Sequence, residues 1–176
     1  MKRVKRSIGL LTVLASWFLA RPVLSCQVIG GPEAPASLVG HADVIAWVRA
    51  EGCSGKAEGP GTTGVATECQ VRFRVLEVIK GKEPSATLGA KGYLTDDDDP
   101  NDVPVPYHFV RPRGRSGNCF AYQYKEGAEY LLMLRWQEGR LTPYWAALAA
   151  TNEQVRGHDD PWLRWVRTAV RVPVAP

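Results

Sequence analysis

The order of apolar and polar residues predicts β-strands over much of the chain. Val71, Phe73 and Val75 alternate with charged residues, which is the period-two pattern of a strand with one buried face. The alternation breaks before Val78, and this break predicts a β-bulge late in a strand over residues 70–79. Similar β-branched and aromatic runs predict further strands at residues 41–50, 86–94, 129–136 and 141–148. The run at 129–136 is the most apolar after the N-terminal segment and is expected to form the central buried strand.

The segments between and after these strands have other patterns. Residues 80–82 and 137–140 contain glycine and charged residues and predict turns, while residues 95–117 are rich in aspartate and proline and predict a long ordered loop. Residues 159–171 begin with aspartates and Pro161, followed by apolar residues at helical spacing. This pattern predicts a C-terminal amphipathic helix packed on the sheet. The strands and turns together predict a mainly β barrel or sandwich.

The N-terminal segment is typical of an export signal. A basic head, Lys2 to Arg6, precedes an uninterrupted apolar run at residues 8–20, and the small residue Ser25 stands before a break. We therefore expect residues 1–25 to be a secretory signal peptide, with a membrane anchor and a buried first helix as the alternatives. The apolar run is shorter than the roughly 20 residues that span a bilayer, and no later segment is long and apolar enough to do so.

Removal of the signal peptide changes the charge of the chain. The precursor has 22 Lys and Arg against 18 Asp and Glu, and five of the basic residues lie in residues 1–25. The mature chain would carry 17 − 18 = −1, so the basic excess that could suggest nucleic-acid binding disappears. The remaining residues, 26–176, have the length of a single domain.

Four cysteines remain after the predicted cleavage: Cys26, Cys53, Cys69 and Cys119. An even number in an exported chain indicates disulfides, and four cysteines allow three pairings. Cys53 and Cys69 bracket the loop between the first two predicted strands, so a bridge between them would close a long hairpin. The cysteine spacing fits no zinc site.

Three short patterns stand in a particular order: Ala42-Asp43-Val44, then Phe73-x-Val75-x-x-Val78-x-Lys80-Gly81, and finally Cys119 followed by Gly127-x-x-Tyr130-Leu131-Leu132. Together they resemble the bacterial branch of the netrin-like family, which includes the tissue inhibitors of metalloproteinases. The resemblance covers residues 26–148. It implies a five-stranded Greek-key barrel of the OB type, with the predicted C-terminal helix packed on it. It also implies that Cys26 pairs with Cys119, which leaves Cys53 to pair with Cys69.

The resemblance also implies a function for the mature N-terminus. In the inhibitors of this family, the α-amino group and carbonyl of an N-terminal cysteine bind the catalytic zinc of a protease, and cleavage after Ser25 would place Cys26 and Gln27 there. The chain departs from the inhibitors because Val28 replaces the second cysteine of their Cys-x-Cys start. The alternative is lipidation of Cys26, since residues 23–26 form an imperfect lipobox that would anchor the chain to a membrane.

Two other groups of residues are candidate binding sites. Asp96, Asp97, Asp98, Asp99 and Asp102 could supply oxygen ligands to calcium, although their spacing is not that of an EF-hand loop. An aromatic set could bind a carbohydrate or a peptide, although core packing also explains most of its members: Tyr107, Phe109, Tyr122, Tyr124, Tyr144 and Trp145.

No catalytic motif supports an enzyme. The sequence lacks a nucleophile elbow, a phosphate-binding loop, a zincin motif and a dinucleotide fingerprint, and His41, His108 and His158 have no nucleophile beside them. We therefore expect a non-catalytic binding module without a cofactor, located in the periplasm, secreted, or lipid-anchored to the outer membrane. Its expected partner is another protein, such as a metalloproteinase, or an envelope component.

Overall fold

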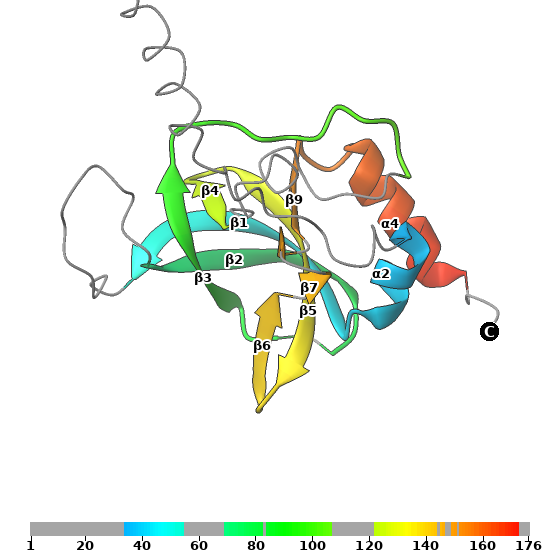
Figure 1. The fold of residues 1–176 in the computed structure, drawn as a ribbon, viewed down its shortest axis with the longest axis horizontal. Coiled ribbons are helices and arrows are strands. Elements are labelled where there is room, and N and C mark those ends of the chain that lie inside the picture. The colour runs from blue at the N-terminus through cyan, green and yellow to red at the C-terminus, as the bar shows by residue number, and fades with distance from the viewer. Residues whose placement is uncertain are drawn as a thin grey trace, which may run out of the picture.

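A computed structural model describes residues 34–54, 69–82, 84–106, 122–143, 145–146, 149–150 and 152–172. Figure 1 shows a curved sheet with two helices on one side of it. The elements in chain order are α2 (Pro35–His41), β1 (Val44–Ser54), β2 (Cys69–Lys80), β3 (Thr87–Thr95), β4 (Gln123–Lys125), β5 (Glu129–Gln137), β6 (Arg140–Pro143), β7 (Trp145–Ala146), β8 (Ala149–Ala150), β9 (Asn152–Val155) and α4 (Pro161–Arg171). The prediction of a mainly β fold with a C-terminal helix is confirmed.

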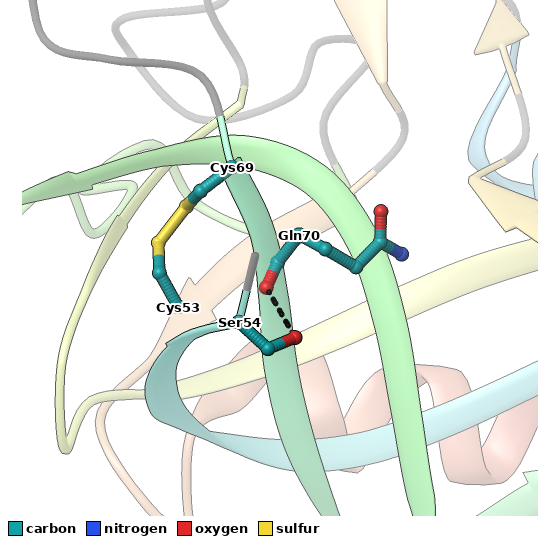
Figure 2. The surroundings of a disulfide bond; sticks show 4 residues. All are labelled: Cys53, Ser54, Cys69 and Gln70. Atoms are coloured by element: carbon teal, nitrogen blue, oxygen red, sulfur yellow. Dashed lines mark hydrogen bonds between the residues drawn. A yellow bond between two sulfur atoms is a disulfide. The ribbon is translucent and has the colours of Figure 1, made fainter. Parts of the chain in front are cut away.

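Strands β1 and β2 form the long hairpin that the sequence predicted. Their antiparallel register skips Leu76 and Ile79, so the late bulge expected in the second strand is present. Cys53 and Cys69 form a disulfide at the end of this hairpin where the connecting loop begins and ends, and Ser54 Oγ donates a hydrogen bond to the Gln70 carbonyl beside it (Figure 2). The proposed Cys26–Cys119 pair lies outside the described residues.

The strand order is that of a Greek key. Strands β1, β2 and β3 are consecutive antiparallel neighbours, and β5 returns to pair antiparallel with the other edge of β1. Among the described residues the sheet has seven strands in the order β4-β3-β2-β1-β5-β6, and β9 also pairs with β5. Strand β4 is parallel to β3. The backbone pairing does not close this sheet, so a five-stranded OB barrel is not confirmed.

Each face of the sheet has its own core, because alternate residues of β1 and β5 point to opposite faces. The helix-side cluster packs α2 and α4 on one face; it comprises Leu38, Val39, Ala42, Ile45, Leu131, Met133, Val155, Trp162, Leu163 and Val166. The inner cluster lies on the concave face; it comprises Val44, Ala46, Val48, Ala50, Val71, Phe73, Ala90, Tyr124, Tyr130, Leu132 and Leu134. The inner cluster contains edge-to-face aromatic pairs, with ring centroids of Phe73 and Tyr124 4.9 Å apart.

Lys80 and Gly81, at the end of β2, each have a structural role. The ammonium of Lys80 donates to the carbonyls of Val39, Gly40 and Ala42 at 2.6–2.9 Å, and it thereby caps the C-terminal end of α2. Burial lowers the pKa of Lys80 from its usual value, and the nearby Asp43 charge opposes this effect. Gly81 has a φ of 87°, and a Cβ built there would lie 2.1 Å from the Asp43 carbonyl oxygen.

Two predicted strand boundaries were wrong. The strand predicted at 41–50 begins at Val44 and runs to Ser54, because residues 35–41 form the helix α2. The strand predicted at 141–148 is divided between β6 and the short strand β7, because β6 ends at Pro143, which has no N–H for a ladder. Strand β9 was not predicted because three of its four residues are polar, although all four are buried. The helix predicted at 159–171 is confirmed as α4, with Asp160 as its N-cap and Pro161 in its first turn.

Candidate binding depression at strand β9

The residues predicted to bind at the N-terminus lie outside the described part of the chain. These residues are Cys26 and Gln27, so zinc chelation by the N-terminus and lipidation of Cys26 both stay predictions. The aromatic set is only partly described, since Tyr107, Phe109 and Tyr144 lie outside the described residues and nothing is described of the Trp145 side chain. Tyr124 is fully buried in the inner cluster, so core packing is confirmed for this member of the set.

Asp98, in the acidic run, lies between two strands that are far apart in sequence. Its Oδ2 accepts a hydrogen bond from Lys125 Nζ of β4 at 2.6 Å, and its Oδ1 accepts one from Gln154 Nε2 of β9 at 2.7 Å. The hydrogen bond from Lys125, followed by that from Gln154, lowers the pKa of Asp98 from its usual value. The hydrogen bond to Asp98 in turn raises the pKa of Lys125. The Asp98 carboxylate therefore links β4 to β9.

The residues after Asp98 continue along the edge of β9. The backbone N–H of Asp99 donates to Gln154 Oε1 at 2.6 Å, and Pro100 forms an isolated parallel bridge with Gln154. Further on, Arg156 donates to the Asn101 carbonyl and forms an ion pair with Asp102. Residues 98–102 thus follow β9 closely.

The buried polar residues of β9 explain why this segment fits there. Asn152 and Gln154 point to the inner face because they pair with Leu132 and Tyr130 of β5. Asn152 Nδ2 donates to the Tyr124 hydroxyl at 3.1 Å, which joins β9 to β4 directly. Buried amide groups need such partners, since an unpaired one would cost about 1–3 kcal/mol.

A hollow of about 530 Å³ opens beside this segment, and we call it the β9 depression. Its lining combines two carboxylates, one guanidinium and exposed backbone, supplied by Asp98, Pro100, Gly127, Ala128, Glu129, Gln154, Val155, Arg156 and Gly157. Gly127 and Gly157 have positive φ, and a Cβ built at either would meet no heavy atom within 4 Å. The depression is therefore an open surface, polar and apolar in similar measure, with backbone accessible at two glycines.

Glu129, which also lines the β9 depression, is held by contacts with β1. Its carboxylate accepts from Trp47 Nε1 at 3.0 Å and from Arg49 at 2.5 Å. The guanidinium of Arg167 lies over the Trp47 ring, 5.5 Å from its centroid, and also pairs with Glu77. These contacts connect β1, β2, β5 and α4.

The acidic run does not gather into a metal site within the described structure. No group of three or more His, Cys, Asp or Glu side chains is placed to hold a metal ion there. Asp98 and Asp102 instead contact Lys125 and Arg156, and Asp96 and Asp97 are exposed. Calcium binding by these residues stays a prediction.

The sequence did not indicate the rest of this site. Gln154 and Arg156 stand in a polar segment without periodicity, and Glu129 was assigned only to a strand. One available signal was the density of hydrogen-bonding side chains at residues 152–156, which is unusual beside an apolar strand such as β5. A polar segment of this kind can be assigned as a strand only when its pairing with β5 is known.

No helix in the described ranges is long and apolar enough to cross a membrane. Comparison with protein-family models and with curated protein sequences finds no match to this chain, so its resemblance to netrin-like proteins remains a hypothesis.

Proposed function

We propose that this chain is an exported, non-catalytic binding module of the bacterial envelope, and that the β9 depression contacts its partner. The observation that carries the proposal is the composition of the depression, an open hollow of about 530 Å³ lined by Asp98, Glu129 and Arg156. These three side chains are held by ion pairs to Lys125, Arg49 and Asp102. A fixed pattern of charges with accessible backbone suits recognition of a polar protein surface.

The proposed architecture is the OB-type barrel of netrin-like proteins. The order β5-β1-β2-β3 supports it, because it places a fourth strand beside the first as in a Greek key. The pattern residues support it too. Lys80 and Gly81 fix α2 and the turn against β1, and the Tyr130 hydroxyl accepts from the Lys125 N–H at 2.7 Å across the turn before β5. These residues have structural roles, so they argue for the fold and not for a particular activity.

The binding proposal is tested by reversing one charge in the β9 depression. The wild-type protein and two variants, Arg156→Glu and Arg164→Glu, are immobilised and exposed to an envelope extract. Arg156 lines the depression, whereas Arg164 is an exposed arginine on α4 and serves as the matched control. We expect a partner retained by the wild type and by Arg164→Glu but lost with Arg156→Glu. Equal retention by all three proteins would refute the role of the depression.

Inhibition of a metalloproteinase through Cys26 is the second candidate. The Greek-key order and the Cys53–Cys69 bridge support it, since both agree with the resemblance to the inhibitors. The protein beginning at Cys26 is compared with a version carrying one additional residue before it, against a panel of zinc endopeptidases. The mechanism requires a free α-amino group, so we expect inhibition only by the first. Inhibition by both versions, or by neither, contradicts chelation.

The lipoprotein alternative makes its own prediction. The intact mass of the native protein, measured from soluble and membrane fractions, distinguishes the two forms of the N-terminus. An unmodified mass starting at Cys26 and lower by four hydrogens supports two disulfides in a soluble protein. An acylated mass in the membrane fraction supports the lipid anchor and excludes chelation by that amine.

A further inference from the structure

Among the described residues, no backbone pairing joins strand β4 to strand β9. Strand β4 pairs with β3 at one end, while β9 pairs with β5 at the other. We propose that residues 98–102 are a polar clasp that holds these two ends together, and that the clasp can open while β1, β2 and β5 stay folded. The clasp also supplies Asp98 and Pro100 to the β9 depression. Its biological meaning therefore rests on the function proposed above.

The Asp98 carboxylate contacts both strands that the clasp joins. Each of its two carboxylate oxygens accepts one hydrogen bond, one from β4 and one from β9. Loss of the negative charge therefore weakens both links at once. The second side of the clasp depends on Gln154, whose amide binds Asp98 through Nε2 and the Asp99 N–H through Oε1. A single side chain on each side thus makes most of the contacts.

The two ion pairs of the clasp are exposed, whereas Asp99 and Gln154 of the same clasp are buried. The side chains of Asp98 and Lys125 are 57% and 35% exposed, and those of Asp102 and Arg156 are 85% and 50% exposed. Exposed ion pairs contribute little and are weakened by salt. The inner cluster, by contrast, is fully buried at Val48, Phe73 and Tyr130. Local opening should therefore occur at the clasp well before the sheet unfolds.

The charges around Asp98 determine how the clasp responds to its surroundings. Lys125 faces it from β4 and Gln154 from β9, while Asp96 adds a further negative charge near Lys125. Both links are stronger when Asp98 is ionised, so acid should weaken the clasp. Salt should open it near neutral pH, because it screens the two ion pairs.

Hydrogen exchange of the purified protein at constant neutral pH tests the clasp. Asp98→Asn removes the charge and replaces one acceptor oxygen by an NH₂ group. Lys125→Met breaks the same contact from the β4 side. Asp96→Asn is the matched control, with the same change of charge two residues earlier in the chain. Exchange is followed by mass spectrometry in peptides from the clasp and its two neighbours (96–106, 122–128 and 152–158) and in peptides from β1 and β2 (44–50 and 71–75).

We expect Asp98→Asn and Lys125→Met to exchange about threefold to tenfold faster in the first three segments, with β1 and β2 unchanged. Raising sodium chloride from about 0.05 M to about 0.5 M should have a similar effect on the wild type and a smaller one on Asp98→Asn. The inference is overturned if both variants behave like Asp96→Asn, or if exchange rises equally in all segments. Neither result depends on a partner, so failure of the clasp and failure of the binding proposal can be told apart.

Discussion

Replacement of Lys80 by methionine removes one ammonium that holds a whole helix. In the wild type this ammonium donates to three carbonyls at the end of α2, at 2.6 Å, 2.9 Å and 2.6 Å. Methionine has a similar length and keeps the apolar packing of the side chain, but it cannot donate. The change therefore isolates the polar contribution of Lys80.

The expected loss of stability follows from the burial of those carbonyls. The contacts to Val39 and Ala42 are partly buried, whereas that to Gly40 is exposed and water can replace it. A hydrogen bond to a charged donor contributes about 1.5–3 kcal/mol when its surroundings exclude water. We take the lower value for each partly buried contact, which gives a loss of about 3 kcal/mol for Lys80→Met.

Urea denaturation followed by tryptophan fluorescence measures this loss. Lys82→Met is the control, because Lys82 is an exposed lysine in the same turn, and its free energy of unfolding should change by less than about 0.5 kcal/mol. The dependence on urea should stay the same in both variants, since neither changes the surface exposed on unfolding. If Lys80→Met and Lys82→Met differ by less than about 0.5 kcal/mol, water satisfies the helix carbonyls equally well and the reasoning is wrong.

Three further predictions concern other parts of the fold. Gly81→Ala should destabilise the protein by about 3 kcal/mol or more, because the new methyl group meets the Asp43 carbonyl and φ is positive; denaturation no different from that of the wild type would contradict this. Replacement of Cys53 and Cys69 together by alanine should cost about 3 kcal/mol, since the bridge closes a loop with a sequence separation of 16, and an unchanged urea midpoint would contradict this. The stabilising effect of Asp98 should be present above its unfolded-state pKa near 3.8 and should disappear as the pH falls towards its lower folded-state pKa. The hydrogen-exchange rates of wild type and Asp98→Asn in residues 96–106 should therefore differ near pH 7 and converge in strong acid, and a constant ratio between them would show that Asp98 acts otherwise.

Local sequence patterns predicted the elements in which apolar residues are buried and polar residues are exposed. Val71 and Phe73 are buried and alternate with three exposed polar residues, so the alternation in β2 could be read directly. Asp160 accepts from the backbone N–H of Trp162, as its place before Pro161 predicted. In both cases the residues that decide the structure are neighbours in the chain.

Other elements depend on residues that are distant in sequence. The helix α2 has only seven residues, and Lys80, about 40 positions later, caps it. Strand β9 is buried because Tyr124 and Asp98 satisfy its amides. The acidic run was recognised as a candidate site, but its true partners, Lys125 and Gln154, could not be identified without the register of the sheet.

The two separate cores also restrict how this chain can change by insertion or deletion. Leu131 and Met133 belong to the helix-side cluster, while Tyr130 and Leu132 belong to the inner cluster. One residue added or lost within β5 would exchange these sets and move a tyrosine ring beneath the helices. Length variation should therefore be tolerated at the tip of the following hairpin, at Glu138 and Gly139, which the structure leaves exposed. A library of random single-residue insertions would show this as a sharp boundary in the yield of folded protein between β5 and the hairpin tip.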